Sequence, residues 1–190
     1  MVSKTRDHLR EFLNNYQTIY KREVEFKKRM ISLLSFPNCF DRSLLHAHFT
    51  ASVWVVNESF DEAILTHHAK LDRWLQLGGH ADGDENLLRV AKKELNEESG
   101  LTRVQAYFDR IFDIDIHTIP ERKGVPQHEH YDVRFLFVAD KEEEINFNHE
   151  SKNVAWVPLT SIAQLCNGND SILRMIEKTE QIRREMSVRH

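Results

Sequence analysis

The sequence of 190 residues has little cysteine, proline or glycine: two Cys, four Pro and six Gly. Cys39 and Cys166 form neither the spacing of a metal site nor a disulfide framework. Purely apolar runs reach only about six residues, far below the ~20 of a membrane-spanning helix. The charged start, "MVSKTRDHLREF", lacks the apolar segment of a secretion signal. We therefore expect a cytoplasmic protein with no membrane partner.

An excess of charge of one sign is also absent. Lys and Arg number 26 against 30 Asp and Glu, which gives a formal net charge of −4. So small a charge does not favour wrapping of nucleic acid, and no nucleic-acid partner is indicated. Hydrophobic residues make up 41% and charged residues 29%, as in ordinary globular proteins of this size. The chain is long enough for one well-buried core and short for two.

The N-terminal part of the chain has a helical pattern. Between residues 5 and 34, apolar side chains recur at steps of three and four residues, with charges between them, until Pro37 interrupts. A segment of about 35 residues buries too little surface to fold alone. We predict a helical N-terminal extension at 1–40 and the main domain at 41–190. The extension is a candidate either to cover the active site or to pair two chains into a homodimer.

The rest of the chain alternates strand-like and helical patterns. Two strands at 48–57 and 62–68 are separated by a short polar turn, which predicts a hairpin. A glycine-bearing loop at 75–85 leads into a helix at 85–98. Further strands are expected at 103–117, 130–139 and 153–158, and closing helices at 159–166 and 171–186. This order predicts an α/β fold in which helices cover a mixed β-sheet.

The predicted helix at 85–98 carries signals at both ends. Asp82, followed three residues later by Glu85, resembles a capping pair, and Asp84 is an equally good N-cap. Gly100 stands where a helix needs a left-handed terminator. These signals fix the approximate limits of the helix.

Three acids, Glu94, Glu97 and Glu98, gather near the C-terminal end of this helix, where the helix dipole disfavours negative charge. At about 100° per residue, Glu94 and Glu98 fall on the apolar stripe and Glu97 at its border. Solvated surface acids are the alternative interpretation, but inward-facing carboxylates repel one another and are costly to desolvate. A bound divalent ion removes both objections, because Mg²⁺ and Mn²⁺ prefer carboxylate oxygens.

The residues from 79 to 101 carry a more specific pattern. It consists of Gly79, Glu85, Lys93, Glu94, Leu95, Glu97, Glu98, Gly100 and Leu101 at fixed spacing. This segment resembles the Nudix box of the Nudix hydrolases, G-x5-E-x7-R-E-U-x-E-E-x-G-U, where U is a bulky apolar residue. Lys93 in place of the box arginine is the single departure. More loosely, the likeness extends over 45–165.

The resemblance implies a Nudix-like α/β/α sandwich and a metal-dependent hydrolase. Such enzymes cleave a phosphoanhydride in a nucleoside diphosphate linked to another moiety, by attack of water on phosphorus. By motif position, Glu94, Glu97 and Glu98 bind Mg²⁺ or Mn²⁺, joined by the Gly79 carbonyl, with Glu97 or Glu98 as a candidate base. A small-molecule nucleotide is the implied partner.

The box also implies a brace between Glu85 and the basic residue at 93. Lysine offers a point charge where arginine offers a fork of fixed donors. Lys93 therefore weakens the expected brace without affecting the metal site. The brace could also be supplied from elsewhere in the chain.

Candidates outside the box come from later segments. The resemblance also implies a candidate metal ligand in Glu150, six residues before Trp156, and a solvated loop acid is the alternative. The acidic run at 142–144 indicates a solvated turn. His80, which follows the double glycine, is a candidate to bind substrate. Strand alternation places His128, His130 and Arg134 on one face, together with Asp132, where they could bind substrate or a further metal; the alternative is the polar outer face of an edge strand.

Two other functions remain open. A Nudix-fold sensor would bind a nucleotide without turnover, but such proteins usually lose box acids that this chain keeps. An enzyme like isopentenyl-diphosphate isomerase would need a cysteine beside the loop, where Gly78 stands. Markers of particular substrate subclasses are mostly missing, so the residues do not name the nucleotide.

Overall fold

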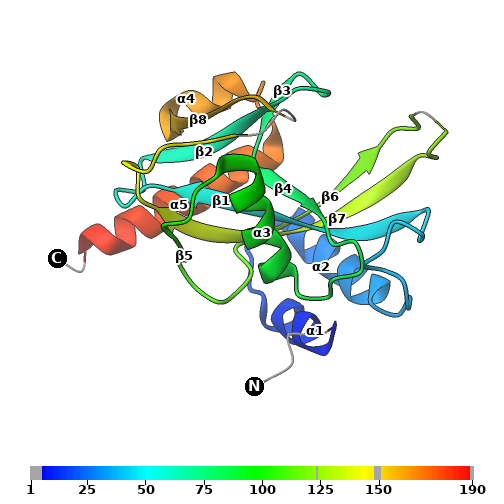
Figure 1. Cartoon of the computed structure of the whole chain (residues 1–190). Helices are drawn as coiled ribbons and strands as arrows, with labels where there is room; N and C mark the ends of the chain where they lie inside the picture. The colour runs from blue at the N-terminus through cyan, green and yellow to red at the C-terminus, as the bar shows by residue number, and fades with distance from the viewer. Residues whose placement is uncertain (1–5, 123, 148–150, 189–190) are drawn as a thin grey trace. The chain divides into compact units, whose positions relative to one another are not determined.

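A computed structural model describes residues 6–122, 124–147 and 151–188 (Figure 1). These segments contain five helices and eight strands, which make an α/β fold with a mixed β-sheet. The helices are α1 Arg6–Asn15, α2 Lys21–Leu33, α3 Leu87–Ser99, α4 Leu159–Leu165 and α5 Asp170–Val188. The strands are β1 Ala47–Val56, β2 Glu62–His68, β3 Arg73–Leu75, β4 Leu77–His80, β5 Val104–Ala106, β6 Asp113–Ile119, β7 His128–Ala139 and β8 Ser151–Pro158.

The chain forms two compact units. Unit 1 consists of residues 1–52, 78–92 and 109–135, and unit 2 of residues 53–77, 93–108 and 136–190. Strands β1 and β7 and helix α3 contribute residues to both. The boundary near residue 40 that the sequence suggests stays a prediction.

Unit 1 contains the N-terminal helices and the ladder of β6 with β7. Helix α1 buries Leu9 and Leu13, and α2 buries Met30 and Leu33, so each helix presents an apolar stripe. The two helices pack together, and α2 lies against β6. Strand β6 runs antiparallel to β7, and β1 pairs with both β7 and β4.

Glu23, on α2, is a fully buried acid that ties the helical segment to β6. Its carboxylate accepts hydrogen bonds from the Tyr16 hydroxyl at 2.7 Å and the Ile114 backbone N–H at 3.3 Å, and another from the Thr18 hydroxyl. A buried carboxylate with several donors avoids most of its desolvation cost. The two N-terminal helices are therefore part of unit 1.

Unit 2 is built around β2. This strand pairs antiparallel with β8 over most of its length and with β3 at its end, as the adjacent ribbons in Figure 1 show. Helix α4 packs on β8 and on α5, and the buried Trp54 donates its indole N–H to the Thr179 hydroxyl of α5 at 2.9 Å. Strand β5 pairs antiparallel with the last residues of β7.

Several predicted boundaries need correction. The expected loop at 75–85 contains the end of β3 and strand β4, because the backbone there pairs with neighbouring strands. The single strand expected at 103–117 is two strands, since β5 and β6 pair with different parts of β7 and the residues between them leave the ladder. Helix α3 begins at Leu87, and Asn86, rather than Asp82 or Asp84, accepts the N–H of Arg89 as its N-cap.

Gly100 ends α3 as the sequence predicts. Its φ of +72° lies in the left-handed region, and its N–H donates to the Asn96 carbonyl at 2.8 Å. A Cβ at this position would lie 2.9 Å from the carbonyl oxygen of Asn146. Both the backbone conformation and the available space therefore require glycine where α3 stops.

Candidate functional site

The acidic end of α3 has the exposure that its helical periodicity predicts. The Glu94 side chain is 17% exposed and that of Glu97 is 52% exposed, while Glu98 is half-buried. Leu95 and Ser99, on the same two turns, are completely buried. Glu94 and Glu98 therefore border the apolar face, and Glu97 reaches water. Three carboxylate groups on one short stretch provide the hard oxygen donors that Mg²⁺ and Mn²⁺ accept.

Lys93 is the basic residue beside these acids. Its Nζ lies 3.8 Å from Oε1 of Glu94 and 3.4 Å from Oε2 of Glu97. The Lys93 side chain is 62% exposed, so each ion pair is screened by water and contributes little to stability. The Lys93 ammonium offsets part of the negative charge on this turn.

Glu85, expected to form the brace, has a partner from the N-terminal helix. Oε1 of Glu85 accepts from Nη2 of Arg6 at 3.0 Å, and Oε2 accepts from the Arg6 backbone N–H at 2.9 Å. The Arg6 guanidinium also donates to the carbonyls of Phe36 and Pro37. An arginine thus holds the carboxylate of Glu85, and it comes from outside the box.

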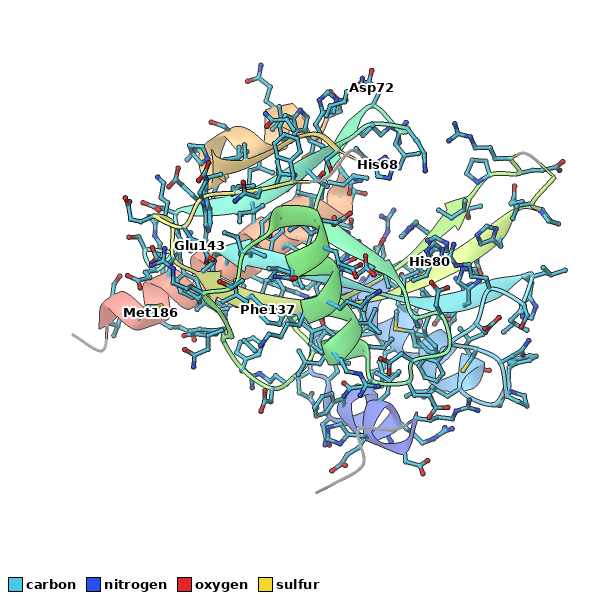
Figure 2. All side chains as sticks on the ribbon, viewed as in Figure 1. His68, Asp72, His80, Phe137, Glu143 and Met186 are labelled. Carbon is cyan, nitrogen blue, oxygen red and sulfur yellow. The ribbon has the colours of Figure 1, made fainter. Side chains whose placement is uncertain are left out.

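A second group of chemically active side chains lies in unit 1, where five imidazoles surround one another. They are His48 from β1, His80 from β4, His117 from β6, and His128 and His130 from β7. Ring centroids of His130 and each of the other four are between 4.7 and 5.4 Å apart. Figure 2 labels His80, which lies beside the β6–β7 ribbons. The structure thus brings together three of the predicted residues, His80, His128 and His130.

Burial favours the neutral form of three of these imidazoles, His48, His80 and His130. It is the largest cause that lowers the pKa of His80 to about 4 and that of His130 to about 2, and neighbouring imidazoles act in the same direction. Burial also lowers the pKa of His48, which is 4% exposed. Neutral imidazoles have a ring nitrogen lone pair free to bind a ligand.

Arg134 lies deeper on the same face of β7. It is 2% exposed and ion-paired with Asp132 at 2.8 Å, Asp113 at 3.1 Å and Asp115 at 3.4 Å. Burial alone would lower the pKa of Arg134, but the three carboxylates together raise it above its ordinary value. The guanidinium of Arg134, predicted to bind substrate, therefore contacts three carboxylates inside unit 1.

In the acidic run at 142–144, Glu143 forms hydrogen bonds that hold this part of the chain to residues 102 and 103. Glu143 accepts from the Thr102 hydroxyl at 2.6 Å and from the backbone N–H groups of Thr102 and Arg103 at 2.9 and 2.8 Å. Glu142 and Glu144 are both exposed. Glu150 lies outside the described residues.

Unit 2 also has a cavity of about 310 Å³, which no local pattern in the sequence indicates. Its lining includes Trp74, whose ring stacks on His67 with centroids 5.1 Å apart, and Cys166, whose thiol donates to the Trp74 carbonyl at 3.4 Å. Burial raises the pKa of the Cys166 thiol to about 11. This thiol is therefore protonated near neutral pH and is a poor nucleophile.

Comparison with known proteins decides the family. A protein-family model described as the NUDIX domain matches residues 46–177, which is more than half of the chain. The chain belongs to the NUDIX family. It is accordingly a Nudix hydrolase, a pyrophosphohydrolase, as the box residues imply. A search of curated proteins finds no match.

Solved Nudix structures have a similar fold. A C. elegans Ap4A hydrolase in a binary complex has a TM-score of 0.56 and 17% identity, covering 70% of this chain and 96% of that one. A NUDIX-family hydrolase from Clostridium perfringens has a TM-score of 0.54 and 25% identity, with 71% and 97% covered. The E. coli dihydroneopterin triphosphate pyrophosphohydrolase has a TM-score of 0.53 and 17% identity, with 68% and 92% covered.

Two further observations concern the isomerase hypothesis and the question of a membrane-spanning helix. A Cβ at Gly78, where the isomerase hypothesis needs cysteine, would lie 2.7 Å from the Ala51 carbonyl oxygen and 2.4 Å from Oγ of Ser52. The close approach of β1 therefore excludes a cysteine side chain without a shift of backbone. None of the helices in the described segments has the length and apolar character needed to cross a bilayer.

Proposed function

We propose that this Nudix hydrolase is dependent on a divalent metal and cleaves a phosphoanhydride in a nucleoside diphosphate linked to another moiety. Glu94, Glu97 and Glu98 hold Mg²⁺ or Mn²⁺, with the Gly79 carbonyl and Glu150 as further ligands. The observation that carries the proposal is the crowding of three carboxylates on the last turns of α3, two of them half-buried, with Lys93 as the adjacent cation. Close like charges of this kind call for a counter-ion.

The donor set fits the proposed metal. Carboxylate and carbonyl oxygens are the hard ligands of Mg²⁺, which also retains several waters and binds substrate phosphates. When bound, such an ion neutralises phosphate charge and lowers the pKa of a coordinated water. Glu97, with half of its side chain exposed, leaves room for a hydrated substrate.

The proposed reaction is a displacement at phosphorus in which a glutamate of the chain accepts a proton. The oxygen of a water molecule forms a bond to phosphorus, and the bond from that phosphorus to the bridging oxygen breaks. Glu97 or Glu98 accepts the proton of the attacking water, and the departing phosphate takes the electrons of the broken bond. The proposal leaves the choice between these two glutamates to experiment.

The substrate class rests on the resemblance of the box. Two of the fold neighbours are named for Ap4A and for dihydroneopterin triphosphate, but at 17% identity they share only the fold. We propose a small-molecule nucleotide as the substrate. His80 remains a proposed substrate-side residue, and His128, His130 and Arg134 remain candidates to contact either the substrate or a further metal.

The proposal is tested by phosphate release from a panel of nucleoside diphosphate compounds with Mg²⁺ or Mn²⁺. We expect turnover that disappears with a chelator and falls by about 10²–10⁴ in kcat when the general base is replaced, as Glu97→Gln or Glu98→Gln. Glu142→Gln removes the same charge from an exposed turn and serves as the matched control. Metal-dependent turnover that is unchanged in both box variants would refute the assignment. Nucleotide binding without turnover across the panel would instead identify a sensor.

A further inference from the structure

We propose that His48, His128 and His130 form a second metal site, in unit 1, that binds Zn²⁺ or a similar late first-row divalent ion. One ligand atom from each of these histidines lies within 4.8 Å of the ligand atoms of the other two. The site uses imidazole donors only and shares no residue with the acids of α3. It is therefore a different site from the proposed Mg²⁺ or Mn²⁺ centre.

The spacing of the nitrogens matches tetrahedral coordination. Nε2 of His130 lies 3.3 Å from Nε2 of His128 and 3.2 Å from Nε2 of His80. Zinc–nitrogen bonds of about 2.0–2.1 Å at tetrahedral angles place two ligand nitrogens roughly 3.3–3.4 Å apart. Nε2 of His130 is thus already separated from Nε2 of His128, and from Nε2 of His80, as two ligands of one ion would be.

Backbone carbonyls direct the lone pairs of two rings into the cluster. Nδ1 of His128 lies 2.8 Å from the Pro126 carbonyl oxygen, and Nδ1 of His48 lies 3.5 Å from that of Leu44. Because a carbonyl only accepts, each Nδ1 carries the proton, which leaves each Nε2 with its lone pair. Metal-bound histidines commonly donate the other ring N–H in this way.

His48 supplies the independent observation. The residue is 4% exposed, and its Nε2 has no hydrogen-bond partner among the described residues. A buried polar atom without a partner costs roughly 1–3 kcal/mol. The centroid of the His48 ring lies 5.1 Å from that of His128 and 5.0 Å from that of His130. A metal ion would give this nitrogen the partner that it lacks.

The donor type selects the ion. Neutral imidazole is a good ligand for Zn²⁺, Ni²⁺ and Cu²⁺, whereas Mg²⁺ requires oxygen donors. The adjacent network contributes three carboxylates and one guanidinium, and Oδ2 of Asp115 lies 3.3 Å from Nδ1 of His117. An excess of carboxylates next to the imidazoles favours a cation over an anionic ligand.

The test is titration of metal-free full-length protein with Co²⁺ and Zn²⁺, followed by the visible absorption of tetrahedral Co²⁺ and by calorimetry. We expect one tetrahedrally coordinated Co²⁺ per chain, displaced by Zn²⁺ and not by a large excess of Mg²⁺. The variants His48→Ala and His128→Ala each weaken binding at least about 10-fold. Because His128 is partly exposed, we expect His128→Ala to fold. It therefore tests the site even if removal of the buried His48 disturbs the core. Circular dichroism establishes that each variant is folded.

Two matched variants separate this site from other binding. His46→Ala removes an exposed imidazole of the same segment and should leave the titration unchanged. Glu97→Gln with Glu98→Gln should also leave the Co²⁺ spectrum unchanged, although it removes the proposed hydrolytic activity. Binding that is lost in the glutamate variant, binding equal in His128→Ala and wild type, or octahedral bands alone would overturn the proposal. Hydrolysis that persists in the glutamate variant, with Co²⁺ binding unchanged, would count only against the proposed function.

Discussion

Arg6 and the carboxylate of Glu85, 79 positions apart in the chain, form a two-point contact. Nη2 of Arg6 donates to Oε1 at 3.0 Å, and its backbone N–H donates to Oε2 at 2.9 Å. Glu85 immediately precedes the N-cap of α3. The N-terminal extension therefore supplies an arginine to the box glutamate in a chain whose own box has Lys93. The planar guanidinium, with its fixed donors, suits a carboxylate better than a point charge does.

This contact predicts a stabilising role for Arg6. Arg6→Ala should lower the free energy of unfolding by about 1 kcal/mol, a value reduced because both side chains are partly exposed. Arg6→Lys should recover only part of that loss, because lysine lacks the planar set of donors. Urea unfolding measures both effects. In a double-mutant cycle with Glu85→Gln, the two changes should not add.

Arg10→Ala is the control for Arg6, since it removes the same charge from the same helix. Equal destabilisation by Arg6→Ala and Arg10→Ala would show that the effect is general charge loss. It would then not be a specific contact with Glu85.

Lys93 predicts a change in metal requirement. Its ammonium lies near the carboxylates of Glu94 and Glu97, so a bound ion must compete with it. Lys93→Ala should lower the Mg²⁺ concentration needed for half-maximal activity by about two- to five-fold at low salt, and by less at high salt. Activity titrations at two ionic strengths measure this shift. Lys92→Ala, an exposed neighbour on α3, is the control, and an equal shift there would argue for a general field effect.

A comparison of Gly83 with Gly100 can separate the cost of backbone strain from the cost of a steric clash. Gly83, with φ of +86°, has open space where a Cβ would stand, whereas a Cβ at Gly100 would contact the Asn146 carbonyl. Gly83→Ala should cost about 1–2 kcal/mol for its left-handed backbone alone. Gly100→Ala should cost more, because Asn146 must also move. Thermal unfolding measures the stability of both variants. Equal losses of stability would mean that Asn146 moves away from the new side chain at no measurable cost.

Local patterns in the sequence predicted α3, its terminator and the β1–β2 hairpin, because each depends on residues close together in the chain. The periodicity that placed Glu94 and Glu98 on the apolar stripe is of the same kind, and their partial burial agrees with it. Alternation along β7 also grouped His128 with His130. These are consequences of helix and strand geometry alone.

The remaining features depend on strand register and long-range packing. His48, His80 and His117 come from three other strands, and only the pairing of those strands brings them to His130. The arginine for Glu85 comes from α1, which no local pattern indicates. The local sequence shows only that His46 and His48 are two residues apart and that His128 and His130 are two residues apart. Alternation of this kind does not reveal which strands become neighbours.

Glu143 predicts a loss of stability in acid. Hydrogen bonds, first from the Thr102 hydroxyl and then from backbone N–H groups, lower the pKa of this carboxyl below its ordinary value of 4.5. A lowered pKa in the folded state means that the unfolded state binds the proton more readily. The stabilisation is therefore present above about pH 4.5 and is lost as the pH falls through the lower folded-state pKa.

The variant that tests this dependence is Glu143→Gln, measured by urea unfolding at a series of pH values. It should be less stable than wild type at pH 7, and the difference should shrink towards pH 3, where the wild-type carboxylate is itself becoming protonated. Glu142→Gln, on the same turn, is the control and should differ little from wild type at any pH, because its exposed side chain lacks these contacts with Thr102. A difference between Glu143→Gln and wild type that stays constant with pH would mean that the Thr102 contacts do not depend on the charge of the carboxylate.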